Sequence, residues 1–187
     1  MNKKNIIVSL FASLFCLFSF GKSSDEVNVT RELKPFKVLT IHDDLNVILI
    51  EGEAPSITIE GGQRTADAVV IEEKGDQLII RKKDLRISQR KVFVYLTVTN
   101  LRSIEVINSA RVFSSGSLEG DLLWVKLAGN GEVNVDSDAT KVLTTSWSNG
   151  KIFVRGHYCS TSTFRSDSGK LVTSYNKNCG NDSAEKN

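Results

Sequence analysis

The chain has 187 residues, with 24 lysines and arginines, 22 aspartates and glutamates and a formal charge of +2 at neutral pH. Lys3 and Lys4 account for this excess, so the rest of the chain is formally neutral and long enough for one ordinary domain. A neutral domain argues against a nucleic-acid-binding protein, which shows a net basic face, and against electrostatic attachment to a membrane surface.

The first 21 residues have the form of an export signal. Lys3 and Lys4 precede an apolar run over residues 6–20, and the small residues around Gly21 predict cleavage after it. The run is shorter than the roughly 20 residues that a membrane span needs, so a cleaved signal is preferred to an uncleaved anchor. We therefore expect export to the periplasm, the outer-membrane surface or the medium, with no membrane span after cleavage.

Alternating apolar and polar residues dominate from Glu32 to Gly180, as in "KVLTIHDDLNVILIEG" and "KVFVYLTVT", and predict an all-β fold. The segment "GQRTADAVVIEE" is the exception and predicts at most one short helix near residues 64–71, with Thr65 as its N-cap. The same segment is also compatible with an extended chain that leads into a strand.

The downstream half repeats a pattern that ends each time on a small residue. Ala110, Gly131, Gly150 and Gly169 mark these positions, at steps of 21, 19 and 19 residues. A fixed period near 20 predicts stacked rungs, because one rung of short strands cannot bury its inner face alone. Small and turn-forming residues suit the corners between strands: Gly129, Asn130, Gly131, Asn149, Gly150, Asp167 and Gly169.

Alternation after each corner assigns the two faces of the following strand. The predicted inner residues are Val133, Val135, Ile152 and Val154, followed by Leu171 and Thr173 in the next rung. The predicted outer residues are Glu132, Asn134, Lys151, Phe153 and Lys170. The strands near residues 122–128 and 142–147 show no single apolar register, so their inner face stays open.

Two cysteines follow the signal segment, Cys159 and Cys179, at nearly equivalent places in adjacent predicted rungs. An even pair in an exported protein predicts a disulfide, and one rung spacing matches the separation that a disulfide needs. A zinc site would need more ligands than these cysteines with the distant His42 and His157 supply. We predict no metal and no cofactor.

Catalytic motifs are absent around both histidines, so we predict no catalytic residue and no enzyme. The enzymatic alternative is a carbohydrate-active protein that uses a carboxylate cluster of Asp136 and Asp138, with Asp121 and Glu132 nearby. The simpler interpretation is that these acids are solvated at the edge of a rung. Asp43 and Asp44 are interpreted in the same way, in a turn between two strands.

Stacked rungs also create flat ladders of outward side chains that can bind ligands. The predicted ligand surface consists of Trp124, Trp147, Phe153, Arg155 and Tyr158. Aromatic rings there would stack on sugars or apolar groups, although aromatics in strands also serve as core. We favour a non-catalytic binding protein whose partner is a glycan or another envelope or surface protein, over a self-associating structural envelope protein and over a polysaccharide lyase or hydrolase.

The order of four segments resembles a known family. "RELKPFKVLTIHDDLNVILIEG", "SITIEGG", "KGDQLIIRKK" and "VFVYLTVTNLRSIEVINSARV" are similar to the putative auto-transporter adhesin, head GIN domain, common in Bacteroidetes. The resemblance implies an exported body of right-handed parallel β-helix-like coils, here a single domain over residues 22–180 before a polar tail at 181–187. The chain departs from the family where Asp44, Leu45 and Asn46 replace Gly-Ile-Asn, and at Ala110, where a glycine is usual.

Overall fold

The computed structural model describes residues 26–84, 92–147, 149–157, 160–165 and 170–175. Within these ranges the chain forms strands and one short helix, which confirms the prediction of a nearly all-β fold. The elements are β1 (Glu26–Glu32), β2 (Val38–Ile41), β3 (Asn46–Glu51), β4 (Ser56–Gly62), α1 (Gln63–Ala66), β5 (Val69–Lys74), β6 (Gln77–Lys82), β7 (Phe93–Val98), β8 (Ser103–Ile107), β9 (Arg111–Leu118), β10 (Leu122–Ala128), β11 (Glu132–Ser137), β12 (Lys141–Ser146), β13 (Lys151–Gly156), β14 (Ser160–Arg165) and β15 (Lys170–Tyr175).

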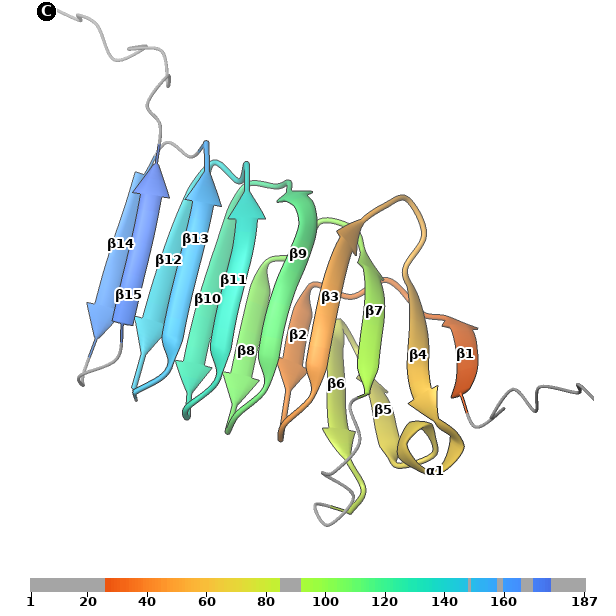
Figure 1. Cartoon of the computed structure of the whole chain (residues 1–187). Coiled ribbons are helices and arrows are strands. Elements are labelled where there is room, and N and C mark those ends of the chain that lie inside the picture. The colour runs from red at the N-terminus through yellow and green to blue at the C-terminus, as the bar shows by residue number, and fades with distance from the viewer. Residues whose placement is uncertain (1–25, 85–91, 148, 158–159, 166–169, 176–187) are drawn as a thin grey trace, which may run out of the picture.

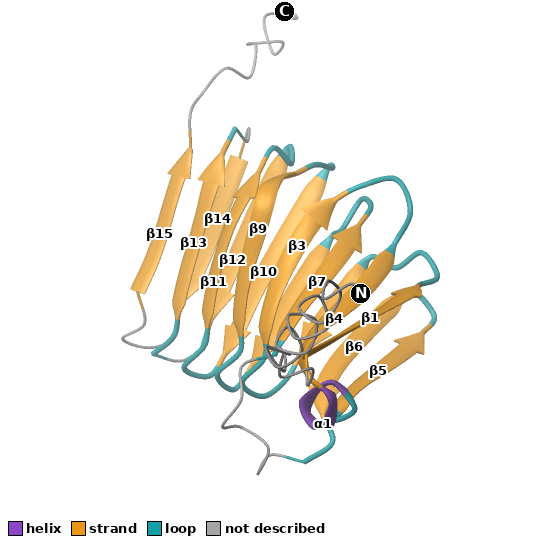
Figure 2. Cartoon of the chain, turned by 45° about the vertical axis from the view of Figure 1, so that its right-hand side comes forward, coloured by secondary structure: helices purple, strands orange, loops and turns teal. Residues whose placement is uncertain are grey.

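The strands form two sheets that lie face to face (Figures 1 and 2). One sheet has eight strands in the order β1-β4-β7-β3-β9-β11-β13-β15, and the other has seven in the order β14-β12-β10-β8-β2-β6-β5. Buried residues of both sheets form one hydrophobic core cluster. The outer faces of the two sheets therefore point away from each other.

From β8 onward the chain alternates between the sheets, and each strand pairs in parallel with the strand two places later. We call each consecutive pair (β8–β9, β10–β11, β12–β13 and β14–β15) a repeat. Arg111 pairs with Glu132, Glu132 with Lys151 and Lys151 with Lys170, which are offsets of 21, 19 and 19 residues. These offsets equal the steps between the small residues that mark the sequence pattern.

The predicted inner face of β11 and β13 is confirmed, because Val133, Val135, Ile152 and Val154 are fully buried. The structure also settles the two strands whose inner face stayed open. In β10 the buried residues are Leu123, Val125 and Leu127, and in β12 the inner residues are Val142, Thr144 and Ser146, while Thr145 between them is covered as well, at 8% exposure. A half-polar inner face in β12 explains why apolar alternation could not identify it.

The first half of the described chain follows a different order. β2 and β3 lie inside their sheets, between β6 or β7 on one side and β8 or β9 on the other. Beyond them, β1, β4 and β7 pair antiparallel, as do β5 and β6, and α1 lies at this end of the body (Figure 2). This excursion was not foreseen from the sequence, and it covers one end of both sheets.

The predicted short helix exists, but its position differs from the expected 64–71. α1 has four residues, its N-cap is Gly62, and the buried Thr65 lies inside it rather than capping it. Val69 and Val70 belong to β5, where they pair with β6. Strand pairing therefore outweighs the weak helical pattern of this segment. Within the described ranges no helix has the length and apolar character needed to cross a bilayer.

Corners between the sheets stack on one another and become tighter along the chain. Backbone hydrogen bonds join each corner to the next, as from Glu132 N–H to the Ala110 carbonyl and from Lys151 N–H to the Gly131 carbonyl, both at 3.0 Å. Equivalent corner positions carry Leu45, Ala110, Gly131 and Gly150. Ala110 is fully buried, so the corner tolerates a methyl group there.

At Gly150 the same corner has no room for a side chain. A Cβ atom there would lie 2.7 Å from the carbonyl oxygens of Gly129 and Gly131 and would clash with Leu127. We expect Gly150→Ala to lower the free energy of unfolding by about 1–3 kcal/mol, measured by urea denaturation. The control is Gly75→Asn, because Gly75 has φ +62° in open space and asparagine tolerates this conformation. An equal loss in both variants would contradict the packing explanation.

Candidate functional site

The predicted ligand surface is divided between the two sheets. Trp124 lies in β10 of the seven-stranded sheet and Trp147 directly follows β12 of the same sheet, whereas Phe153 and Arg155 lie in β13 of the eight-stranded sheet. Tyr158 lies outside the described residues, as do Cys159, Cys179 and the predicted cleavage position at Gly21. The structure therefore brings the two tryptophans onto one sheet and leaves the other two residues on the opposite one.

Trp124 points outward because its neighbours Leu123 and Val125 point into the core. Its indole Nε1 donates a hydrogen bond of 3.0 Å to Oγ1 of Thr145 on β12, and the Nζ of Lys126 lies 4.1 Å from the ring centroid. The hydrogen bond fixes the tilt of the indole, and the ammonium covers part of one ring face. The side chain nevertheless remains 37% exposed.

Trp147 is 47% exposed and belongs to the next repeat. Its backbone N–H donates to the carbonyl of Leu127 at 3.0 Å, which holds this position beside the end of β10. Thr145, two residues earlier, is the register partner of Lys126. The two exposed indoles thus lie on neighbouring repeats of one sheet. We call Trp124, Lys126, Thr145 and Trp147 the tryptophan platform.

Phe153 and Arg155 alternate with the buried Ile152 and Val154 and therefore face outward from the eight-stranded sheet. Phe153 is half-buried. Arg155 Nε donates to Oδ1 of Asp136 on the neighbouring strand β11 at 2.9 Å. Arg155 is thus an ion-pair partner across repeats as well as an exposed cation.

The acidic residues proposed for the enzymatic alternative bond separately to residues of the next repeat. Asp136 pairs with Arg155, whereas Asp138 Oδ1 accepts from the backbone N–H of His157 at 3.1 Å and lies 3.2 Å from its Nδ1. The Ser117 hydroxyl and the His157 donors lower the pKa of Asp138. A general acid in glycoside hydrolysis needs a raised pKa instead.

No three His, Cys, Asp or Glu side chains gather into a possible metal site within the parts of the chain that the structure describes. Asp121 contacts the chain through its carbonyl, which accepts from Lys141 N–H at 2.9 Å. The carboxylates of Asp136 and Asp138 are therefore arranged as inter-repeat contacts.

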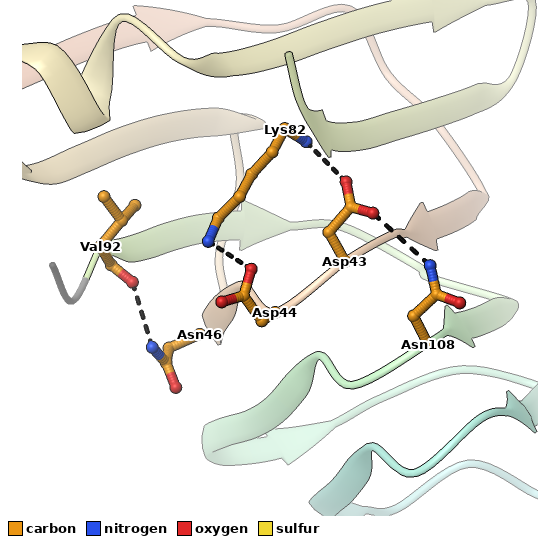
Figure 3. A network of polar contacts seen from close by, with 6 residues as sticks. All are labelled: Asp43, Asp44, Asn46, Lys82, Val92 and Asn108. Carbon is orange, nitrogen blue, oxygen red and sulfur yellow. Dashed lines mark hydrogen bonds and ion pairs between the residues drawn. The ribbon is translucent and has the colours of Figure 1, made fainter. Parts of the chain in front are cut away.

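A polar network joins the turn between β2 and β3 to β6 and to the corner before β9 (Figure 3). Asp43 and Asp44 form this turn, as predicted, with Asp43 in the left-handed region at φ 69°. Asp43 Oδ2 accepts from Lys82 N–H at 2.9 Å, and its Oδ1 accepts from Asn108 Nδ2 at 3.5 Å. Three segments distant in sequence are thereby held together.

Lys82 completes this network with a buried ion pair. Its side chain is 4% exposed and its Nζ contacts Oδ1 of Asp44, which is 38% exposed (Figure 3). Asp44 is thus a partly exposed acid that also serves as a counter-ion, which the sequence did not indicate, since a lysine on the inner side of β6 needs one. Alternation in "QLIIRK" places Lys82 on the same face as Leu78 and Ile80, and this signal was missed.

Asn46, at the place of the asparagine in Gly-Ile-Asn, fixes the start of another strand. Its Nδ2 donates to the carbonyl of Val92 at 3.3 Å, just before β7 (Figure 3). The network therefore positions strands, and the exposed aromatic surfaces are the better candidates for ligand binding.

Comparison with known proteins agrees with the all-β architecture. The family model described as putative auto-transporter adhesin, head GIN domain matches residues 35–175. No curated protein matches the chain.

Solved structures with low sequence identity share the fold. A putative adhesin from Parabacteroides distasonis aligns with a TM-score of 0.52 and 14% identity, over 80% of this chain and 78% of that one. A putative adhesin from Bacteroides fragilis gives 0.50 and 14%, over 82% and 97%. A putative cell adhesion protein from Clostridium sporogenes gives 0.50 and 10%, over 81% and 100%.

The buried ion pair gives one prediction. Asp44→Ala leaves the ammonium of Lys82 buried without its counter-ion, so we expect a loss of about 2 kcal/mol, less than for a fully buried pair because Asp44 is partly exposed. Lys82→Met removes the charge, keeps the apolar stem and leaves Asp44 hydrated, so the loss should stay within about 1 kcal/mol. Urea denaturation measures both. If Lys82→Met costs as much as Asp44→Ala, the assignment is wrong.

The lowered pKa of Asp138 gives a second prediction, on pH. Its ionised carboxylate stabilises the fold fully above the ordinary pKa of 3.8, and this contribution is lost as the pH falls through the lower folded value. The melting temperature of Asp138→Asn should therefore be below that of the parent at pH 7, and the gap should close in acid. His157→Ala keeps the backbone N–H that donates to Asp138, so its melting temperature at pH 7 should fall less than that of Asp138→Asn. A gap that does not change with pH would contradict this.

Proposed function

Because the chain belongs to the putative auto-transporter adhesin, head GIN domain family, we propose that it is an exported, non-catalytic binding protein of the adhesin type. The family description suggests an exported or surface protein, and the sequence adds a start typical of an export signal. Our proposal locates the protein in the periplasm, on the outer-membrane surface or in the medium.

The tryptophan platform is the observation that carries this proposal. Two indoles, 37% and 47% exposed, belong to neighbouring repeats, one on β10 and one directly after β12, although burying them in a core would contribute more to stability. Thr145 and Lys126 hold the orientation of Trp124 before a ligand arrives. A preoriented flat ring suits the apolar face of a sugar, so our proposed ligand is a glycan.

The same proposal includes a finer description of the body and its maturation. We infer right-handed parallel β-helix-like coils, supported by the in-register parallel pairing of β11 with β13 and of β10 with β12. We further propose cleavage after Gly21 and a disulfide between Cys159 and Cys179. The latter is supported by the 19-residue offset that pairs Lys141 with Ser160, next to Cys159.

Self-association is the second candidate function, and one feature favours it. In the described part of the chain β14 and β15 each pair with a single strand, at the end of the body opposite α1 (Figure 1). Open strand edges can add a strand from another chain. Because β14 and β15 are the last strands of the two sheets at the same end of the body, a second chain would meet two such edges together.

The test of the proposed function is a glycan array probed with the purified protein. We expect at least one bound glycan, and we expect Trp124→Ala and Trp147→Ala each to weaken its binding about tenfold with unchanged melting temperatures. The matched control is Val29→Ala on β1, since Val29 is also 47% exposed but lies on the other sheet.

Three outcomes would contradict the proposal. Glycan binding that both tryptophan variants retain would remove the platform from the function. Oligomers in light scattering without any glycan bound would favour self-association. Release of reducing ends from a polysaccharide would identify an enzyme instead.

A further inference from the structure

The outer face of the eight-stranded sheet carries a row of three aromatic residues, one isoleucine and one asparagine that is separate from the tryptophan platform. Its members lie on five adjacent strands as successive register partners and are all partly exposed: Tyr95, Ile48, Phe113, Asn134 and Phe153. We call them the outer row. Strict register places them in a line across the strands.

The three aromatic rings of the outer row occur on every second strand. Tyr95 is on β7, Phe113 on β9 and Phe153 on β13, while β3 and β11 between them carry Ile48 and Asn134. Neighbouring strands lie about 4.8 Å apart, so successive rings are roughly 9.6 Å apart. An extended β-linked polysaccharide turns the same face outward at alternate sugars, at a repeat close to this spacing.

Polar groups beside the rings of the outer row orient one ring and offer a hydrogen-bond acceptor to a polar polymer. The Tyr95 hydroxyl donates to the Glu60 carboxylate on β4, which raises the pKa of Tyr95 and holds its ring. Between Phe113 and Phe153, Asn134 has a shielded Oδ1 that finds no hydrogen-bond partner among the described residues. Such a group is costly to leave unpaired, and a sugar hydroxyl could satisfy it after rotation of the amide.

One side of the outer row is lined by exposed cations. Arg111 and Lys151 are exposed, and the half-buried Glu132 lies between them in the same register. Within the described ranges neither cation lies within ion-pair distance of a carboxylate, whereas Arg155 on the other side is paired with Asp136. The line beside Phe113 and Phe153 thus has a net positive charge available to an anionic ligand.

We propose that the outer row binds an extended, β-linked polysaccharide that carries carboxylates. The rings of Tyr95, Phe113 and Phe153 stack on alternate sugars, and Arg111 and Lys151 meet the carboxylates. This site goes beyond the proposed function, because it lies on the opposite outer face from the tryptophan platform. A protein that used both faces would bridge two polymers.

The experiment compares two polymers that differ at one carbon of each sugar. The purified protein is titrated calorimetrically with β-1,4-linked polymannuronate and with neutral β-1,4-mannan. We expect polymannuronate to bind at least tenfold more tightly, and its affinity to fall with added salt. Phe153→Ala should weaken binding about tenfold, and Lys151→Gln several-fold.

Controls separate this site from the tryptophan platform and from loss of folding. Trp124→Ala and Lys141→Gln alter the other sheet face and should leave polymannuronate binding unchanged. Lys151→Gln changes an exposed side chain, so it tests the site even if Phe153→Ala lowers stability. Equal binding of both polymers, preference for the neutral one, no binding, or loss of binding in Trp124→Ala would each overturn the proposal.

Discussion

Parallel backbone pairing between repeats is the constraint on which the rest of this structure depends. A repeat consists of two short strands, one in each sheet, and cannot bury its inner face alone. Pairing of β11 with β13 at an offset of 19 residues places Val133 on Ile152 and Val135 on Val154, all fully buried. The corners obey the same offset, so the positions of Gly131 and Gly150 must stay free of side chains.

The same register determines what the outside of the molecule offers to a partner. Equivalent outer residues of successive repeats line up across the strands, so a ligand surface here is a flat row rather than a pocket. Phe113 and Phe153 belong to one such row on the eight-stranded sheet, whereas on the seven-stranded sheet Trp124 is in register with Leu143 and Trp147 follows the end of β12. The outer faces of the two sheets point in opposite directions because both sheets contribute to a single core.

The sequence predicted the regular half of the fold well because its physical signals are local. The spacing of small residues gave the pairing offsets, and alternation gave the inner faces of β11 and β13. It did not predict the excursion through β4, α1 and β5, since antiparallel and parallel pairings share one alternation pattern. Nor could spacing alone tell that Trp124 and Phe153 lie on different sheets, because that depends on which strand each corner leads to. Lys82 was missed because a charged residue is rarely read as part of an inner face.

Pairing between repeats can be tested directly by nuclear Overhauser contacts in the folded protein. In-register parallel pairing predicts contacts between residues 19 apart, such as Glu132 with Lys151 and Lys141 with Ser160, and no short Hα to Hα contacts among β10 to β15. Short Hα to Hα contacts between these strands, or contacts at another offset, would show antiparallel or shifted pairing and contradict the account.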